Sequence, residues 1–190
     1  MRPSELLVPG GITELVGGPS SGRTSVLATC LRDVTSRGAL AALVDTDHVF
    51  DPVGAGRAGV ELSRVLWVRC GHRLDRALQV ADLLVRCPGF ALVGLDTGDL
   101  TPRLTLAMAY RLKLAVRRTG TALVVVAGHR ALASGAALAF AASRRGVEWT
   151  GPRPAPSRLV GVDTAVHVLR ARSMAPAWRP GAIHLIRLSA

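Results

Sequence analysis

The stretch ITELVGGPSSGRTS, residues 12–25, joins a short apolar strand to a helix through a glycine-rich turn. Gly17, Gly22 and Thr24 fit the phosphate-loop template G-x-x-x-x-G-K-[ST], while Arg23 stands where the template has lysine. In such a loop, backbone N–H groups and the helix N-terminus surround phosphates, and the hydroxyl holds Mg²⁺. The alternative is a glycine turn that binds nothing. The predicted cofactor-binding residues of this loop are Gly17, Ser20, Ser21, Gly22, Arg23, Thr24 and Ser25.

Strands and helices alternate on the C-terminal side of this loop. Apolar positions recur at helical spacing in three segments and form nearly continuous runs in four others, as buried parallel strands do. This alternation predicts an α/β protein with three layers, a mainly parallel central sheet, and a site at the carboxyl ends of the strands. We expect helices over 22–36, 74–86 and 103–118, and strands over 40–45, 65–70, 90–96 and 121–127.

The pattern changes after residue 130. The small-residue segment ALASGAALAFAAS, residues 131–143, predicts a short helix packed on the sheet. Three alternating segments follow, at 144–149, 162–169 and 183–188, and predict antiparallel strands added at one sheet edge. The run PRPAPS at 152–157 is too short to separate domains, so we expect residues 1–190 to form a single domain.

Composition predicts a soluble, cytoplasmic protein without a membrane contact. Apolar residues make up 49% of the 190 residues, but the run from Ala122 to Ala127 is far shorter than the roughly 20 residues of a membrane span. The N-terminus, MRPSELLVPGG, contains no apolar segment of signal-peptide length. Cys30, Cys70 and Cys87 form no C-x-x-C pair and the histidines are scattered, which favours buried free thiols over a structural metal.

The charge is distributed unevenly along the chain. The net charge is +11, and residues 100–190 carry 14 basic side chains against only Glu148 and Asp163. Such an excess favours a polyanionic or acidic partner, with non-specific binding of nucleic acid as the first candidate. The alternative is a solvated basic face in an arginine-rich proteome, since Lys113 is the only lysine.

Asp96 ends the apolar strand FALVGLD, residues 90–96. Its position after a buried strand is typical of the Mg²⁺-associated acid in phosphate-loop proteins, so Thr24 and Asp96 are the predicted metal ligands if a nucleotide binds. The alternative for Asp96 is a strand-end acid that caps a neighbouring helix.

Several segments in order resemble the core domain of the RecA/Rad51 recombinase superfamily. GGITELVGGPSSGRTSVL is similar to the opening of that core, and FALVGLDTGDL resembles its Walker B segment. ALVDTDHVFDPVGAGRAGVELSRVLWV is similar to its second strand, DP turn and following strand. SGAALAFAASRR and VHVLRARSMAPAW resemble its later segments. The resemblance implies a RecA-like phosphate-loop fold over nearly the whole chain.

Four positions depart from the superfamily pattern. Arg23 replaces the loop lysine, and Asp47 stands where the family has its water-activating glutamate. Gly54 replaces the tyrosine expected to stack on adenine, and His129 lies where an Asn-Gln pair is expected. Asp47 and His129 are therefore only degenerate catalytic candidates. The resemblance implies weak or absent ATP hydrolysis, no required cofactor, and at most weak binding of ATP or ADP with Mg²⁺.

The DNA-binding parts of the superfamily are reduced in this sequence. The segments after Asp96 and after His129 are short where recombinases carry two DNA-binding loops, and the N-terminal oligomerisation extension is expected to be absent. Arg170 and Arg172 match two family lysines on the face that meets a neighbouring protomer. The predicted partner-binding or nucleic-acid-binding residues are Arg130, Arg144, Arg145, Arg170 and Arg172.

Within the superfamily, this combination most resembles the ImuA family. That resemblance implies a pseudo-ATPase adaptor in SOS-induced, error-prone translesion synthesis. Its implied partners are an ImuB-like inactive Y-family polymerase, RecA, an error-prone C-family polymerase complex, and DNA. Two alternatives stay open: an active DNA-dependent ATPase or recombinase paralogue, and a SulA-like inhibitor of cell division.

Overall fold

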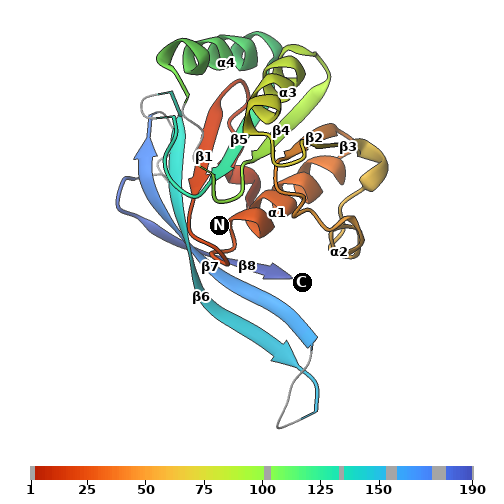
Figure 1. Ribbon diagram of the computed structural model, residues 1–190. Coiled ribbons are helices and arrows are strands. Elements are labelled where there is room, and N and C mark those ends of the chain that lie inside the picture. The colour runs from red at the N-terminus through yellow and green to blue at the C-terminus, as the bar shows by residue number, and fades with distance from the viewer. Residues whose placement is uncertain (1–2, 101–103, 133–134, 153–157, 173–178, 190) are drawn as a thin grey trace.

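The computed structural model describes residues 3–100, 104–132, 135–152, 158–172 and 179–189 (Figure 1). In this part of the chain, eight strands form one sheet in the order β3-β2-β4-β5-β1-β6-β7-β8. The first five strands in that order run parallel, and β6, β7 and β8 pair antiparallel at the opposite edge. The predicted α/β class with a mainly parallel sheet and antiparallel edge strands is therefore confirmed. The strands are β1 (Ile12–Val16), β2 (Leu40–Asp45), β3 (Val65–Arg69), β4 (Phe90–Asp96), β5 (Ala122–Ala127), β6 (Leu138–Thr150), β7 (Arg158–Ala171) and β8 (Ile183–Ser189).

Helices cover both faces of the sheet and give the molecule three layers (Figure 1). Helix α1 (Arg23–Thr35) buries apolar residues such as Leu27 and Leu31 against one face, next to Phe140 of β6. Helices α3 (Leu74–Arg86) and α4 (Leu106–Thr119) bury small and aliphatic residues against the other. The strands between them are apolar on both sides because each face meets a helix layer. The described helices include none that is both long and apolar enough to cross a bilayer.

The predicted helix over 131–143 is wrong. Residues 138–150 form β6, whose first half pairs parallel with β1 and whose whole length pairs antiparallel with β7. Leu138, Phe140 and Ala142 are buried in one cluster, with the two-residue period of a strand. Strand pairing across the sheet therefore overrides the local helix preference of the alanines. Residues 133–134 of the predicted helix lie outside the described residues.

The last strands are longer than predicted. Strand β6 absorbs the segment expected at 144–149, and β7 begins four residues before the expected strand at 162. Together β6 and β7 form a long hairpin that projects beyond the helical layers (Figure 1). Most of both proline-containing connections, at 153–157 and 173–178, lies outside the described residues.

Local signals explain the remaining differences at element ends. Helix α4 begins at Leu106 because the Thr105 side chain accepts a hydrogen bond from the Met108 N–H at 3.2 Å. Asp51 caps the short helix α2 (Pro52–Arg57) in the same way, accepting from the Val53 N–H at 3.0 Å. Two further one-turn elements are 3₁₀ helices, η1 (Pro3–Leu6) and η2 (Leu62–Arg64).

The cysteines do not all lie in the core. Cys30 and Cys70 are buried free thiols, as predicted, whereas Cys87 is exposed. The expectation of burial fails at Cys87 because it follows the last residue of α3 and precedes the turn at Pro88 and Gly89.

Candidate functional site

The glycine-rich turn lies between β1 and α1, at the carboxyl edge of the parallel strands. Gly22 is the N-cap of α1 with φ of 88°, and a Cβ there would lie 2.1 Å from Thr164 Oγ1 on β7. A Cβ on Gly17 would lie 2.7 Å from the Ala142 carbonyl oxygen. Gly22 is therefore required both by backbone conformation and by contact with β7, and Gly17 by contact with β6. Ser20 also adopts a positive φ, of 56°.

Arg23 is held inside the protein. Its side chain is 8% exposed, and Nη2 lies 2.5 Å from Oδ1 of Asp99, which follows β4. Nη1 of Arg23 is buried and has no hydrogen-bond partner in the described structure. The cation that replaces the template lysine is thus paired with a carboxylate of the same protein, and only part of its hydrogen-bonding capacity is used.

Thr24 and Asp96 lie together, where the sequence places a Mg²⁺ site. Thr24 Oγ1 donates to Asp96 Oδ2 across 3.1 Å, and the Gly98 N–H donates to Asp96 Oδ1 at 2.9 Å. Burial raises the pKa of the Asp96 carboxyl, and the two hydrogen bonds and nearby Arg23 partly oppose that rise. The pair has the donor types that a nucleotide-bound Mg²⁺ uses. Their role as metal ligands stays a prediction.

Two buried polar atoms indicate that an anion fits the turn. Ser21 Oγ and Arg23 Nη1 are both buried without a partner in the described structure. Buried polar atoms are normally satisfied, and a phosphate oxygen can accept from both groups. The residues present therefore fit a phosphate, although the Asp99 carboxylate already neutralises the cation that would attract it.

The degenerate catalytic candidates lie at the same edge of the sheet. The Asp47 carboxylate lies against Gly98, since a Cβ on that glycine would be 1.8 Å from Asp47 Oδ2. Asp47 Oδ1 is also 3.4 Å from Nδ1 of the exposed His72. His129 is exposed on the segment after β5. The structure thus brings Asp47 to the turn that follows Asp96, and leaves His129 in contact with solvent.

A cavity of about 290 Å³ lies beside the turn, between α1 and the segment 49–58. Thr24, Ser25 and Arg32 line one side, and Asp51 and Gly54 line the other. Gly54 is the position where the superfamily resemblance predicts a base-stacking aromatic ring. The cavity volume is at the low end of ligand pockets, about 300–1,000 Å³. Position 54 contributes no ring to its wall, and the aromatic residue that lines it is Phe50.

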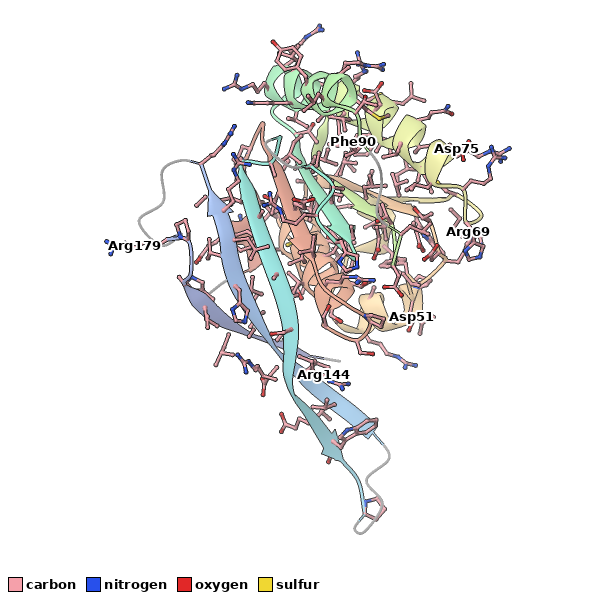
Figure 2. All side chains as sticks on the ribbon, turned by 60° about the vertical axis from the view of Figure 1, so that its left-hand side comes forward. Asp51, Arg69, Asp75, Phe90, Arg144 and Arg179 are labelled. Atoms are coloured by element: carbon pink, nitrogen blue, oxygen red, sulfur yellow. The ribbon has the colours of Figure 1, made fainter. Side chains whose placement is uncertain are left out.

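The predicted partner-binding arginines divide between two places. Arg144 and Arg145 are exposed on the β6–β7 hairpin, where Arg144 pairs in register with the Thr164 that contacts the glycine turn (Figure 2). Arg130 and Arg170 lie instead around Glu14 of β1. Glu14 pairs with Ala139 of β6, and Ala139 pairs in turn with Arg170 of β7.

Glu14 is a buried charged residue near these arginines that the sequence did not single out. Its side chain is fully buried and accepts from the Leu132 N–H at 2.9 Å, from the Ala131 N–H, and from Arg130 Nε at 3.2 Å. Partial burial and the charges of Arg172 and Arg130 lower the pKa of Arg170, so these cations are held close together. The sequence signal is an acid inside an otherwise apolar strand. The sequence also offered a reason to consider Asp99, because it lies three residues after the Walker B-like strand.

Comparison with known proteins gives one family match. The sequence model of the RecA N-terminal domain matches residues 7–123. Protein RecA of Borreliella afzelii (strain PKo) is 35% identical over 98 residues, which are 51% of this chain and 27% of that protein. Protein RecA of Synechococcus sp. (strain CC9605) is 38% identical over 95 residues, 50% of this chain and 25% of that protein. The matches thus span about a quarter of each relative's length.

A solved structure extends the likeness across the whole chain. The crystal structure of the RadB recombinase superposes with a TM-score of 0.69 and covers 98% of this chain and 92% of that one. The two sequences are 17% identical, so this likeness concerns the fold.

Proposed function

Because this chain belongs to the family of the RecA N-terminal domain, we propose that it is a RecA-like adaptor that retains the nucleotide-site scaffold without rapid ATP hydrolysis. The observation that carries the proposal is the ion pair between Arg23 of the phosphate loop and Asp99, which follows β4. A lysine in this loop serves catalysis by reaching the terminal phosphates. A guanidinium held at 2.5 Å by an internal carboxylate has a competing partner whenever a phosphate approaches.

The other departures support the same conclusion. Asp47 is one methylene shorter than the glutamate that the superfamily resemblance predicts, and it already contacts Gly98. Small displacements of a catalytic group cost orders of magnitude in rate, because proton transfer needs hydrogen-bond distance. Gly54 also supplies no aromatic ring where the superfamily resemblance predicts one, although Phe50 lines the same cavity. Nucleotide binding, if it occurs, is therefore weak, with Thr24 and Asp96 supplying the side chains for Mg²⁺.

The proposed context is DNA damage tolerance. The resemblance to the ImuA family supports a role in error-prone translesion synthesis, with an ImuB-like inactive Y-family polymerase, RecA and an error-prone C-family polymerase complex as partners. The basic second half of the chain supports direct, non-specific contact with DNA. Arg144 and Arg145 on the projecting hairpin are exposed and accessible to such a ligand.

ATP turnover tests the proposal against its alternative, an active DNA-dependent ATPase. The hydrogen bond between Thr24 and Asp96 supports that alternative, since both side chains are of types that bind Mg²⁺. Hydrolysis of radiolabelled ATP is measured with and without single-stranded DNA, for the wild type and Thr24→Ala. We expect no turnover above background in either protein. Turnover that requires Thr24 would establish an active ATPase instead.

Partner and DNA binding are tested separately. Co-purification with an inactive Y-family polymerase homologue, compared with an active Y-family polymerase, tests the adaptor role. Fluorescence anisotropy with a labelled oligonucleotide tests DNA binding, which we expect to weaken steeply with salt as counterions are released. Absence of DNA binding at low salt would remove DNA from the proposal and leave the protein partner in place.

A further inference from the structure

Helix α4 presents an apolar stripe to solvent. Leu106, Tyr110 and Leu114 follow each other at four-residue spacing, which places them on one side of the helix. They are 78%, 62% and 43% exposed, respectively. Leu112 and Val116, on the other side of α4, are fully packed in the core. Single exposed apolar residues are ordinary, but a continuous row of them marks an interaction surface.

The charged residues of α4 all have the same sign. Arg111, Lys113, Arg117 and Arg118 lie within Leu106–Thr119, which contains no acidic residue. Protein surfaces usually intersperse both signs. Within the described ranges, Arg111 alone of these four forms an ion pair, with Asp82 of α3 at 2.7 Å. The stripe is thus bordered by four cations, of which Lys113, Arg117 and Arg118 form no ion pair within the described ranges.

A groove of about 760 Å³ runs beside the stripe, between α4 and the end of α3. Arg86, Arg111, Arg118, Leu114 and Pro88 line it. One carboxylate, Asp82, accepts from Arg86 at 3.1 Å and from Arg111 at 2.7 Å. A single negative charge against three guanidinium groups leaves the groove positive. This arrangement is complementary to a partner that supplies carboxylates and apolar side chains together.

We propose that the stripe and this groove, together the α4 surface, dock an amphipathic helical segment of a partner protein. The segment carries leucine-like residues on one side, with Asp or Glu residues beside them. The stripe extends over about 12 Å of helix axis, which matches two turns of a partner helix. Apolar anchors at i and i+4 that enter a groove are a common mode of helix recognition, and tyrosine and arginine are frequent hot-spot residues.

Lipid and nucleic acid fit this surface less well. An interfacial membrane helix buries a broad apolar face. In α4 the broad apolar face is already packed against the sheet, and a narrow stripe remains exposed. A phosphate backbone would pair with the arginines but leave the leucines and Tyr110 uncovered. The inference rests on the proposed adaptor role and names the surface through which a protein partner binds. The α4 surface lies on the sheet face opposite α1, so nucleotide binding does not affect it directly.

The test uses the full chain and a synthetic 18-residue peptide with Leu on one helical face and Glu flanking it. A second peptide has the same composition with the two residue types scattered around the helix. Amide chemical shifts of the labelled protein are followed during titration with each peptide. We expect shifts confined to residues 82–88 and 106–119 with the amphipathic peptide, and at least about tenfold weaker binding with the scattered one.

Substitutions then assign the binding to named side chains. Tyr110→Glu and Arg118→Glu are each expected to weaken binding about tenfold or more. Two matched controls change residues elsewhere: Leu185→Glu alters an equally exposed leucine on β8, and Arg37→Glu reverses a charge after α1. Both controls should bind the peptide as the wild type does.

Two outcomes would overturn the inference. Shifts centred on β6 or β7 would place acidic-peptide binding at the other basic residues. Binding to anionic phosphatidylglycerol vesicles or to an oligonucleotide that is lost in Tyr110→Glu, without peptide binding, would assign the surface to that ligand. ATP turnover, or failure to bind the polymerase, would overturn the proposed function while the peptide result stood independently.

Discussion

The guanidinium of Arg23 donates to the carboxylate of Asp99 across 2.5 Å, so the segment after β4 supplies a counter-ion to the phosphate loop. Asp99 is 65% exposed, which limits the strength of the pair to about 1 kcal/mol by solvent screening. That energy is small beside the attraction between a guanidinium and a multiply charged phosphate. The pair therefore weakens binding of an anion at this loop without preventing it.

Removing Asp99 should strengthen nucleotide binding. In Asp99→Ala the Arg23 guanidinium loses its internal partner and is free to pair with phosphate. We expect the affinity for a fluorescent ATP analogue to rise by up to about fivefold, the equivalent of about 1 kcal/mol. Fluorescence titration at low ionic strength measures the change.

A control separates this effect from the loss of one negative charge. Asp75→Ala removes an exposed acid that pairs with Arg73 at 2.7 Å on α3, away from the loop. This variant should bind the analogue as the wild type does. An equal gain in Asp75→Ala would show that net charge, and not release of Arg23, controls the affinity.

Gly22 cannot carry a side chain without disturbing β7. In Gly22→Ala the new Cβ would lie 2.1 Å from Thr164 Oγ1, on a backbone with φ of 88°. We expect a loss of about 2–3 kcal/mol in the free energy of unfolding, from the clash and from the strained backbone together. Urea denaturation measures it.

The second variant in that experiment is Thr164→Ala, which removes the clashing hydroxyl. Combined with Gly22→Ala it should recover part of the loss, while the backbone cost of about 1 kcal/mol remains. Strictly additive effects of the two substitutions would mean that the loop does not contact β7 as described.

Elements with local signals were predictable from the sequence. The bounds predicted for α3, at 74–86, and for β2 and β4 agree with the structure because a repeating apolar pattern specifies them. The helix predicted over 131–143 was wrong, because the alanines of this segment favour a helix in isolation. Only the pairing of β6 with β1, more than a hundred residues earlier in the chain, makes it a strand.

The sequence predicted which residues lie at the site, but it did not predict which of them form ion pairs and hydrogen bonds with one another. The proximity of Thr24 to Asp96 follows from the template and the strand order, and the structure places them 3.1 Å apart. The ion pair between Arg23 and Asp99 joins residues 76 positions apart, and it depends on the rotamer of the buried Arg23 side chain. Glu14 could be placed on a strand from the sequence, but its partners come from a segment whose path sequence alone does not specify.

Ionisation of Asp96 should destabilise the protein at neutral pH. Burial raises its pKa in the folded protein above the ordinary aspartate value of about 4. The folded state therefore holds this proton more tightly than the unfolded state, and the cost of ionisation is complete above the raised pKa and absent below about pH 4. Asp96→Asn should raise the melting temperature at pH 7, and the gain should shrink as pH falls through the raised pKa.

Circular dichroism melts of the two proteins across this pH range provide the measurement. Asp75→Asn is the matched control with the opposite sign, because Arg73 lowers the pKa of Asp75 to about 2. Its carboxylate stabilises the fold above about pH 4, and that contribution disappears as pH falls toward 2. If Asp96→Asn lowered the melting temperature at pH 7, the hydrogen bonds to the carboxylate would outweigh its burial.

Glu14 should be worth more to stability than the arginine that pairs with it. The buried carboxylate accepts from the Ala131 and Leu132 N–H groups, so Glu14→Ala leaves two buried donors unsatisfied, at about 1–3 kcal/mol each. Arg130 has a side chain that is 36% exposed, so Arg130→Ala should cost about 1 kcal/mol or less. Urea denaturation of both variants compares them, with Glu14→Gln expected between the two because it keeps one acceptor oxygen. Equal losses in Glu14→Ala and Arg130→Ala would mean that the ion pair, and not the backbone anchoring of residues 131–132, is what Glu14 contributes.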